Sequence, residues 1–430
     1  MLNRRQILAG LFALPLTLAG CEIDTINSFP TKAAHVRVVN AIPNAPSLDV
    51  KVDGATSWPA LPFEGMTGYS DFSNQTHTFS VTVTGAISTL TQANFNLAGE
   101  ASYTLIAFGP VEAPALLLLS DDTISPSSGR FLLRVANAAA GAATFDVYVT
   151  APGAALDTLA PNLSSISYGG STGFLQLSSG TLQLRLTQTG TKAVIYDSGA
   201  RTWSDNTATD AIMYTRSGGQ LVNLALADIN GANQRVIVNS TLTDVKFVNA
   251  AFDTGAVNSL LDGTVVNSNI AYAAALGYNI VAPGAHTISF EATATPGATV
   301  ASVATTLAAA TDTSVFIAGF AGAVRAIVLQ DANFPAINAN PRLRIVNASP
   351  DAPALDVLVN GTRQVSALAF PTASAYLSLS SGTYTLTFNN PSTGATVFTA
   401  SGVALTSGQT STLYLIGPAA QLSTLLTRDY

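Results

Sequence analysis

Two stretches of the chain, roughly 300 residues apart, carry nearly the same twenty residues. Residues 35–54 read HVRVVNAIPNAPSLDVKVDG and residues 342–361 read RLRIVNASPDAPALDVLVNG, with 12 of 20 positions identical. A chain that repeats a long segment at a wide separation folds as copies of one structural unit. The number of copies therefore constrains the architecture more than any single motif does.

Two weaker copies lie between these stretches. Each of the four copies has a basic residue three positions before an Asn-Ala pair, and an Asp or Asn nine positions after that Asn. These signature residues are Arg37, Asn40 and Asp49; Arg134, Asn137 and Asp146; Lys246, Asn249 and Asn258; and Arg344, Asn347 and Asp356. The sequence predicts four units joined like beads on a string. The Asn-to-Asn spacings of 97, 112 and 98 residues leave an alternative open, in which units one and two, and units three and four, form two larger bodies.

Within a unit the apolar residues recur with a period of two. Segments 177–190 (LSSGTLQLRLTQTG), 281–292 (VAPGAHTISFEA) and 379–388 (LSSGTYTLTF) alternate in this way after a turn signal. Such alternation is typical of half-buried strands, and many short strands with frequent turns indicate a sandwich or a barrel. We therefore expect an all-β fold of tandem antiparallel, immunoglobulin-like β-sandwich units with seven or eight strands each. Residues 301–311 are Ala-rich but also rich in Thr, and we interpret them as strand and turn.

Linker-like segments divide the units. The predicted organisation is a signal peptide at 1–20, a lipidated Cys with its tether at 21–33, and β-sandwich units at 34–124, 129–231, 241–333 and 341–430. The second linker is the least clear, because residues 236–238 could form a strand. Each unit closes on an apolar run followed by an acid, at Asp122, Asp228, Asp331 and Asp429.

The repeated block also has a local interpretation. Val36 and Val38 form a strand that ends at Asn40, and Pro43 and Pro46 then hold an extended loop. The Asp of the signature begins the next strand, where its carboxylate can cap loop amides. A contact with a ligand or an ion is the alternative for the same side chain.

This block, written R-x-V-N-A-x-P-x-A-P-x-L-D-V-x-V-[DN]-G, resembles the signature of domain of unknown function 4397. The resemblance is strong in units one and four. It weakens in unit two, where residues 139–142 replace the proline segment, and in unit three, where Asn258 replaces the Asp. It implies tandem domains in a secreted or surface protein of bacteria, and it implies no reaction and no functional residues.

The N-terminus has the features of a processing signal. Arg4 and Arg5 precede an apolar stretch that ends in Leu18-Ala19-Gly20-Cys21, and Cys21 is the only cysteine of the chain. This resembles the lipobox of bacterial lipoproteins, which implies cleavage before Cys21 and acylation of its thiol. In such lipoproteins, an Asp at the position after the Cys favours retention in the inner membrane. This chain has Glu22 at that position, so the resemblance favours the outer membrane if the envelope has an outer membrane. The run NRRQIL (3–8) also resembles a twin-arginine export motif, so the export route stays open.

Composition and motifs argue against an enzyme and against nucleic-acid binding. Charged residues make up only 10% of the chain, the net charge is −7, and no basic patch is evident. The three histidines, His35, His77 and His286, lie in unrelated places and pair with no nucleophile motif. We find no phosphate-binding Gly loop and no zinc-ligand cluster in the sequence. We therefore expect no catalytic residues, no cofactor and no metal.

Two sets of residues remain as weak candidates for binding. The acids Asp121 and Asp122, and the group Asp205, Asn206 and Asp210, offer oxygen ligands, but neither matches a calcium loop, and we interpret them as solvated loop residues. Trp58 and Trp203 lie in loop-like sequence and could form sugar platforms if they are exposed. A buried packing role is the alternative for each indole.

From these observations we expect a non-enzymatic, lipid-anchored lipoprotein of the bacterial cell envelope with a structural or adhesive role, facing the periplasm or the cell surface. A carbohydrate- or cell-wall-polymer-binding array is the first alternative and a secreted enzyme the second. The expected partners are the membrane, through the lipid, and glycans, cell-wall polymers or envelope proteins.

Overall fold

A computed structural model describes residues 32–43, 45–122, 125–142, 144–216, 220–230, 234–334 and 340–429. All regular structure in these residues is β-strand, which confirms the all-β prediction. None of the described segments forms a helix long and apolar enough to span a membrane. The predicted signal peptide, Cys21 and most of the tether lie outside the described residues.

The first unit is a sandwich of two four-stranded sheets, ordered β4-β1-β7-β8 and β3-β2-β5-β6. Its strands are β1 (Ala34–Ala41), β2 (Leu48–Val52), β3 (Ala55–Leu61), β4 (Ser70–Phe72), β5 (Thr76–Val83), β6 (Thr89–Asn96), β7 (Ser102–Phe108) and β8 (Ala115–Ser120). All neighbouring strands are antiparallel except β1 and β7, which are parallel. The expectation of a purely antiparallel sandwich therefore fails at this one pair.

The second unit has the same plan, with sheets β12-β9-β15-β16-β17 and β11-β10-β13-β14. Its strands are β9 (Arg130–Asn137), β10 (Phe145–Thr150), β11 (Leu163–Ile166), β12 (Leu175–Ser178), β13 (Gly180–Gln188), β14 (Val194–Trp203), β15 (Ala208–Thr215), β16 (Val222–Asp228) and β17 (Arg235–Val238). Strand β17 pairs with β16 and extends this sheet beyond residue 231, the predicted end of the unit. The segment 236–238, uncertain in the sequence, is therefore a strand of unit two.

The third unit contains sheets β21-β18-β25-β26, with β22 also on β18, and β20-β19-β23-β24. Its strands are β18 (Thr243–Ala251), β19 (Val257–Leu261), β20 (Thr264–Ile270), β21 (Ala274–Ala275), β22 (Asn279–Val281), β23 (Gly284–Ala292), β24 (Thr299–Leu307), β25 (Asp312–Gly319) and β26 (Arg325–Asp331). The Ala-rich segment 301–311 thus belongs to a strand and the turn after it, as predicted.

The fourth unit contains sheets β30-β27-β33-β34 and β29-β28-β31-β32. Its strands are β27 (Arg342–Asn347), β28 (Leu355–Val359), β29 (Thr362–Leu368), β30 (Leu377–Ser378), β31 (Gly382–Asn389), β32 (Thr396–Leu405), β33 (Thr410–Ile416) and β34 (Ser423–Arg428). The parallel pair recurs in units two, three and four as β9 with β15, β18 with β25, and β27 with β33.

Each unit buries its own core between its two sheets. In unit one, Val36 and Val38 of β1 pack with Val50 of β2 and Phe79 of β5, and all four side chains are fully buried. Alternate residues of a strand point to opposite faces, so the period-two segments supply one apolar face each. This explains why short, charge-poor strands suffice to build four separate cores.

The first strand of each unit is also buried on its second face. In unit one, Val39 and Ala41 of β1, with Ile106 of β7, pack against Ile212 and Tyr214 of unit two in a second apolar cluster. In the other half of the chain, Val248 and Phe316 of unit three meet Val346 and Tyr414 of unit four in the same way. Strands buried on both faces read as nearly continuous apolar runs, as these do.

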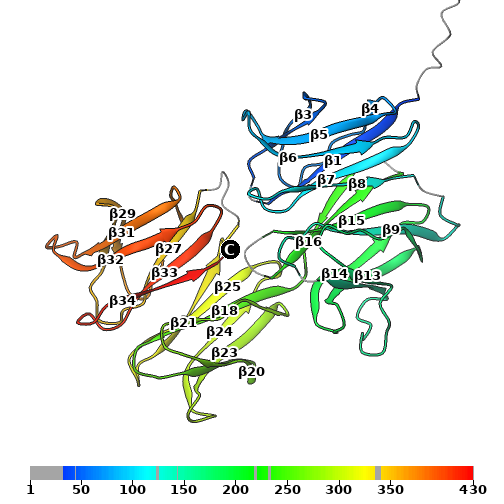
Figure 1. Cartoon of the computed structure of the whole chain (residues 1–430). Coiled ribbons are helices and arrows are strands. Elements are labelled where there is room, and N and C mark those ends of the chain that lie inside the picture. The colour runs from blue at the N-terminus through cyan, green and yellow to red at the C-terminus, as the bar shows by residue number, and fades with distance from the viewer. Residues whose placement is uncertain are drawn as a thin grey trace, which may run out of the picture.

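The units therefore form two pairs, one with two and three with four, and Figure 1 shows the facing sheets of each pair. The expectation of four separate beads on a string is wrong. The structure instead buries an apolar face of each parallel strand pair against the neighbouring unit.

Fragments provide a test of this pairing. We expect residues 34–240, which span the first pair, to be a folded monomer with a cooperative melting transition. Residues 34–122 alone leave the face around Val39 and Ile106 uncovered, so this fragment should self-associate or bind a hydrophobic dye. Light scattering after size exclusion, with thermal melting, checks both. A monomeric and equally stable fragment 34–122 would contradict the pairing.

Candidate functional site

The signature Asn makes the same hydrogen bonds in all four units. In unit four, the Asn347 side-chain amide donates to the carbonyl of Leu368 (3.1 Å), and its oxygen accepts from the Ser349 amide (3.1 Å). Asn40, Asn137 and Asn249 form the equivalent pair of bonds, and all four side chains are completely buried. The Asn thus fixes the turn after the first strand to the end of the third strand, which belongs to the opposite sheet.

The signature Asp or Asn, nine residues later, holds an irregular point in the third strand of its unit. Its side-chain oxygen accepts the amide of Ala60, Ser165, Asn269 or Ala367, at 2.8 to 2.9 Å. Each of these four residues has a positive φ, between 47° and 58°. The left-handed region is unfavourable for a non-glycine residue, and the side-chain acceptor compensates for it. These bonds also lower the pKa of Asp49, chiefly through the amide of Ala60, and the pKa of Asp356, chiefly through the amide of Ala367.

The signature basic residue lies on the face that meets the neighbouring unit. In each unit an aromatic ring covers its charged group at 4.5 to 5.0 Å: Tyr69 covers Arg37, Phe174 covers Arg134, Tyr278 covers Lys246 and Tyr376 covers Arg344. All four basic side chains are at least 95% buried. A buried cation needs a matching anion, and here the anions come largely from the other unit of the pair.

In the first pair, Arg134 of unit two binds two carboxylates. Its guanidinium forms a bidentate contact with Asp210 of its own unit, at 2.6 and 2.9 Å, and donates to Asp121 of unit one at 2.7 Å. Bidentate contacts between arginine and carboxylate are among the stronger hydrogen bonds in proteins. Arg37 of unit one reaches the other way and donates to the backbone carbonyl of Asp228 in unit two at 2.5 Å.

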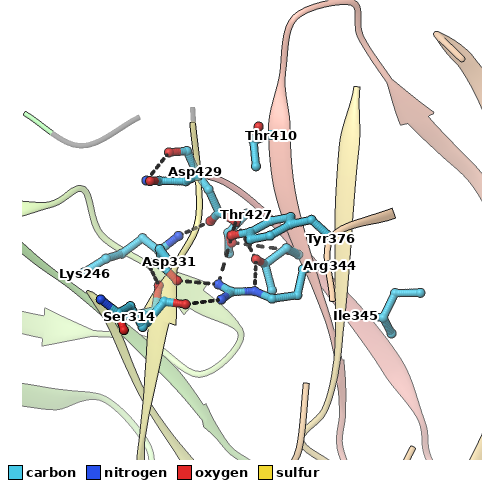
Figure 2. A network of polar contacts seen from close by, with 12 residues as sticks. Lys246, Ser314, Asp331, Arg344, Ile345, Tyr376, Thr410, Thr427 and Asp429 are labelled. Atoms are coloured by element: carbon cyan, nitrogen blue, oxygen red, sulfur yellow. Dashed lines mark hydrogen bonds and ion pairs between the residues drawn. The ribbon is translucent and has the colours of Figure 1, made fainter. Parts of the chain in front are cut away.

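The second pair repeats this exchange, as Figure 2 shows. Lys246 of unit three forms an ion pair with Asp429 of unit four. Arg344 of unit four donates to Asp331 of unit three at 2.6 Å. The basic residue of each unit is therefore neutralised by an acid of its neighbour, and the arrangement is reciprocal.

Hydroxyl groups complete the coordination of the acids. Asp331 accepts from Ser314 and Tyr278, each at 2.6 Å, and Asp429 accepts from Thr412 at 2.5 Å and Tyr376 at 2.8 Å. Burial, and then the neighbouring carboxylates, raise the pKa of both tyrosines above its usual value, so each phenol stays protonated and donates. Burial alone would lower the pKa of Arg344, but the charge of Asp331 raises it. The Arg344 guanidinium therefore stays charged throughout the accessible pH range.

Unit two departs from this pattern in two coordinated places. Its acid stands on β15 as Asp210, where the other units have the hydroxyls of Thr104, Ser314 and Thr412. Its covering ring is Phe174, which has no hydroxyl to donate. Because the carboxylate of unit two lies on β15, it does not need a hydroxyl donor from the covering ring. Burial raises the pKa of Asp210, and the bond from Arg134 opposes that shift.

Two further buried acids lie next to each other at the start of unit three. Asp244 of β18 and Asp312 of β25 are register partners on the parallel strands and are 0% and 3% exposed. The amide of Gln220, from unit two, donates to Asp244 at 2.8 Å. Burial, followed by the charge of Asp312, raises the pKa of Asp244 to about 10. Asp244 is therefore protonated at neutral pH, at a point where unit two meets unit three.

The two tryptophans lie in the unit cores and not on a binding face. Trp58 is 7% exposed and packs beside Phe72, and Trp203 is 5% exposed and stacks on Phe131 at 4.9 Å. The hypothesis of sugar platforms at these residues is therefore wrong, because the loop-like sequence around each indole belongs to a strand whose side chain points inward.

The candidate calcium ligands are also used differently from the expectation. Asp121 and Asp210 are buried and bound by Arg134, so they are not solvated loop acids. Asp205 accepts from the Gly129 amide and Asp122 from the Ser102 amide, and the Asn206 carbonyl accepts from Asn230. No group of three potential metal ligands occurs in the part of the chain that the structure describes.

The histidines contact single carboxylates. His77 pairs with Asp53 at 2.6 Å and His286 with Asp262 at 2.7 Å, at equivalent turns of units one and three. His35 pairs with Asp71 at 2.7 Å on the surface. His77 and His286 each connect their strand to the turn after a neighbouring strand, and His35 connects β1 to β4. The three lie in separate places, as the sequence indicated.

Sequence reasoning missed that the basic residues and the terminal acids form one site. The acids that bind the cations are Asp121, Asp331 and Asp429, each 17 residues after a strand hydroxyl. In units one and two the acids that close the sequence repeat are Asp122 and Asp228, whereas the acids that bind Arg134 are Asp121 and Asp210. The available signal was the aromatic residue 32 positions after the basic residue in units one, three and four.

Fold and repeats together define a tandem repeat protein built from β-sandwich units. The family model described as Domain of unknown function (DUF4397) matches residues 34–148, 243–357 and 341–430. The chain belongs to this family. Residues 149–242, which make up most of unit two and include its displaced acid Asp210, lie outside the matched segments.

Comparison with curated proteins finds no match. Among solved structures, the chain is similar to the Bacillus anthracis TIE protein at 10% identity and a TM-score of 0.14, over 89% of this chain and 68% of that one. It is also similar to BcpA, the major pilin subunit of Bacillus cereus, at 10% identity and a TM-score of 0.15, over 68% of this chain and 100% of that one. At these TM-scores neither likeness carries an argument about this chain.

The ionic site between units gives a mutational prediction. Arg134→Met removes the cation that binds Asp121 and Asp210 and leaves both carboxylates buried, which should cost about 3–5 kcal/mol of unfolding free energy. Arg130→Met, on the same strand but exposed, is the matched control and should change little. Denaturant unfolding of both variants measures the difference, and equal stabilities would contradict the site.

The raised pKa of Asp244 gives a pH prediction. The folded chain keeps a proton on Asp244 up to about pH 10, whereas the unfolded chain releases it near pH 4. The folded state therefore binds more protons in this window, and the contribution of this group to stability falls as the pH rises. Asp244→Asn, which mimics the neutral carboxyl, should flatten the decline of the melting temperature between about pH 5 and about pH 9. An unchanged slope in the variant would exclude this titration.

Proposed function

We propose that this protein is a non-enzymatic structural lipoprotein of the bacterial cell envelope, anchored through a lipid on Cys21. One observation carries the structural part of the proposal. The residues that the sequence repeats four times are used to hold turns, strands and neighbouring units together. Ten of these twelve residues are buried, Asp49 and Asn258 are half-buried, and the side chains are bound by other groups of the chain.

The paired arrangement supports the role of a spacer. A pair locked by an apolar cluster and two reciprocal cations has less freedom than two units on a flexible linker. Four units in two such pairs would hold an attached group at a defined distance from its anchor. The low fraction of charged residues, 10%, leaves surfaces rich in Ser, Thr and Asn, which suit weak contacts with envelope polymers or proteins.

The anchor is argued from the sequence. The segment Leu18-Ala19-Gly20-Cys21 resembles a lipobox, and only about a dozen residues separate Cys21 from β1 at Ala34. A short tether would place unit one close to the membrane. A single acyl chain binds a membrane only marginally, so stable anchoring needs more than one acyl chain.

Fractionation tests the anchor. In cells expressing the full chain, we expect the protein in the membrane fraction, carrying a label from an alkyne-tagged fatty acid. Cys21→Ser should lose the label and move the protein into the soluble fraction, while Ser28→Cys on that background should restore neither. A wild-type protein that is soluble and unlabelled would overturn the anchoring proposal and leave the fold untouched.

A further inference from the structure

In each unit, one strand of the sheet that faces the paired unit borders the second strand of the parallel pair; in units one, three and four it is the last strand and forms the sheet edge. These strands are β8, β16, β26 and β34, and each pairs along its inner side with β7, β15, β25 or β33. An uncovered edge presents unpaired backbone groups and is a template for another strand. What covers the outer side of these four strands therefore decides whether the edge can bind.

Three of the four edges have cover. In units one and three, β6 and β24 of the opposite sheet lie close to β8 and β26. In unit two, β17 pairs with β16 in antiparallel register. In unit four, β32 makes no comparable contact with β34, and no strand of the described residues pairs with its outer side.

The exposure of one leucine side chain shows the difference between the covered edge of unit two and the uncovered edge of unit four. The strand register makes Leu226 of β16 and Leu426 of β34 equivalent, because Asp210 faces Ala227 and Thr412 faces Thr427. Leu226 lies opposite Val236 of β17 and is 6% exposed. Among the described residues Leu426 has no strand neighbour of this kind, and it is 42% exposed.

The backbone of β34 is oriented to accept a strand. In unit two the Asp228 amide donates outward to Gln234, just before β17. In unit four the Asp429 amide donates inward, to Thr410. Amides alternate along an antiparallel strand, so those of Thr424 and Leu426 point outward, as the amides of Leu224 and Leu226 do on β16, where it faces β17.

We propose that the outer edge of β34 is a docking site for an extended strand of a partner protein, bound antiparallel by β-augmentation. The chain itself shows the chemistry of the occupant. Strand β17 places Val236 opposite Leu226, Ile237 against the cluster between units one and two, and Val238 in the core of unit two. The partner segment should accordingly carry consecutive β-branched apolar residues and no charge opposite Leu426.

The probe is the peptide Gln234–Asn239 (QRVIVN), used free at millimolar concentration and also fused to the C-terminus of the full chain through a flexible Gly/Ser linker. We expect the fused peptide to raise the melting temperature and to slow amide exchange in residues 423–428. The free peptide should slow the same amides. Leu426→Pro removes an outward amide, leaves the pairing with β33 in place, and should abolish both effects. Leu426→Val, which keeps the amide, should retain them.

Two results would overturn the proposal. The first is that neither the fused nor the free peptide changes amide exchange in residues 423–428, although thermal melting shows that the chain is folded. The other is a dimer of the full chain that Leu426→Pro dissociates, because the occupant would then be a second copy and not a foreign strand. The same peptide with Lys in place of Ile237 controls for nonspecific binding.

Discussion

The structure depends on a reciprocal exchange of buried charges between neighbouring units. Each pair buries two cations and two carboxylates, and most of the partners are contributed by the opposite unit. Removing a charge from water is costly unless a partner of opposite charge is in place. A unit that folds alone leaves its basic residue on an uncovered face, so the docked pair is the state in which every charge is satisfied.

Apolar packing and ion pairing have separate roles in this interface. The clusters around Ile212 and around Phe316 supply apolar burial, which favours association but specifies orientation only weakly. The ionic groups specify it, because Lys246 meets Asp429 only in one arrangement of units three and four. Eight of the chain's 43 charged residues lie in these two networks, a large share for a chain so poor in charge.

Much of the fold could be predicted from the sequence, since it is written in local patterns. Period-two alternation identified strands such as β13 and β31, and the fourfold signature identified the units. The parallel pairing of β1 with β7 could not be predicted, because it joins segments about 65 residues apart and has no local signal. The pairing of units was inferred as an alternative from the Asn-to-Asn spacings alone. The first strand of each unit, which is apolar on both faces, was the stronger signal for this pairing.

The candidate site was harder to predict, for a physical reason. The signature Asn and Asp act within a few strands of their own position, and the capping role expected for the Asp is what the bonds of Asp356 show. The basic residues act between units, so their partners depend on tertiary placement. The burial of Trp58 and Trp203 could not be predicted for a similar reason, because a loop-like sequence does not reveal which side of a strand faces the core.

A double-mutant cycle on Lys246 and Asp429, contributed by units three and four, tests this account most directly. The unfolding free energy of the second pair would be measured by denaturant titration for the wild type, Lys246→Met, Asp429→Leu and the double variant. If the two charges neutralise each other between units, the double variant should lose less than the sum of the single variants, with a coupling of about 1–3 kcal/mol. Additive losses would mean that the two side chains do not meet, and would contradict the pairing of units through exchanged charges.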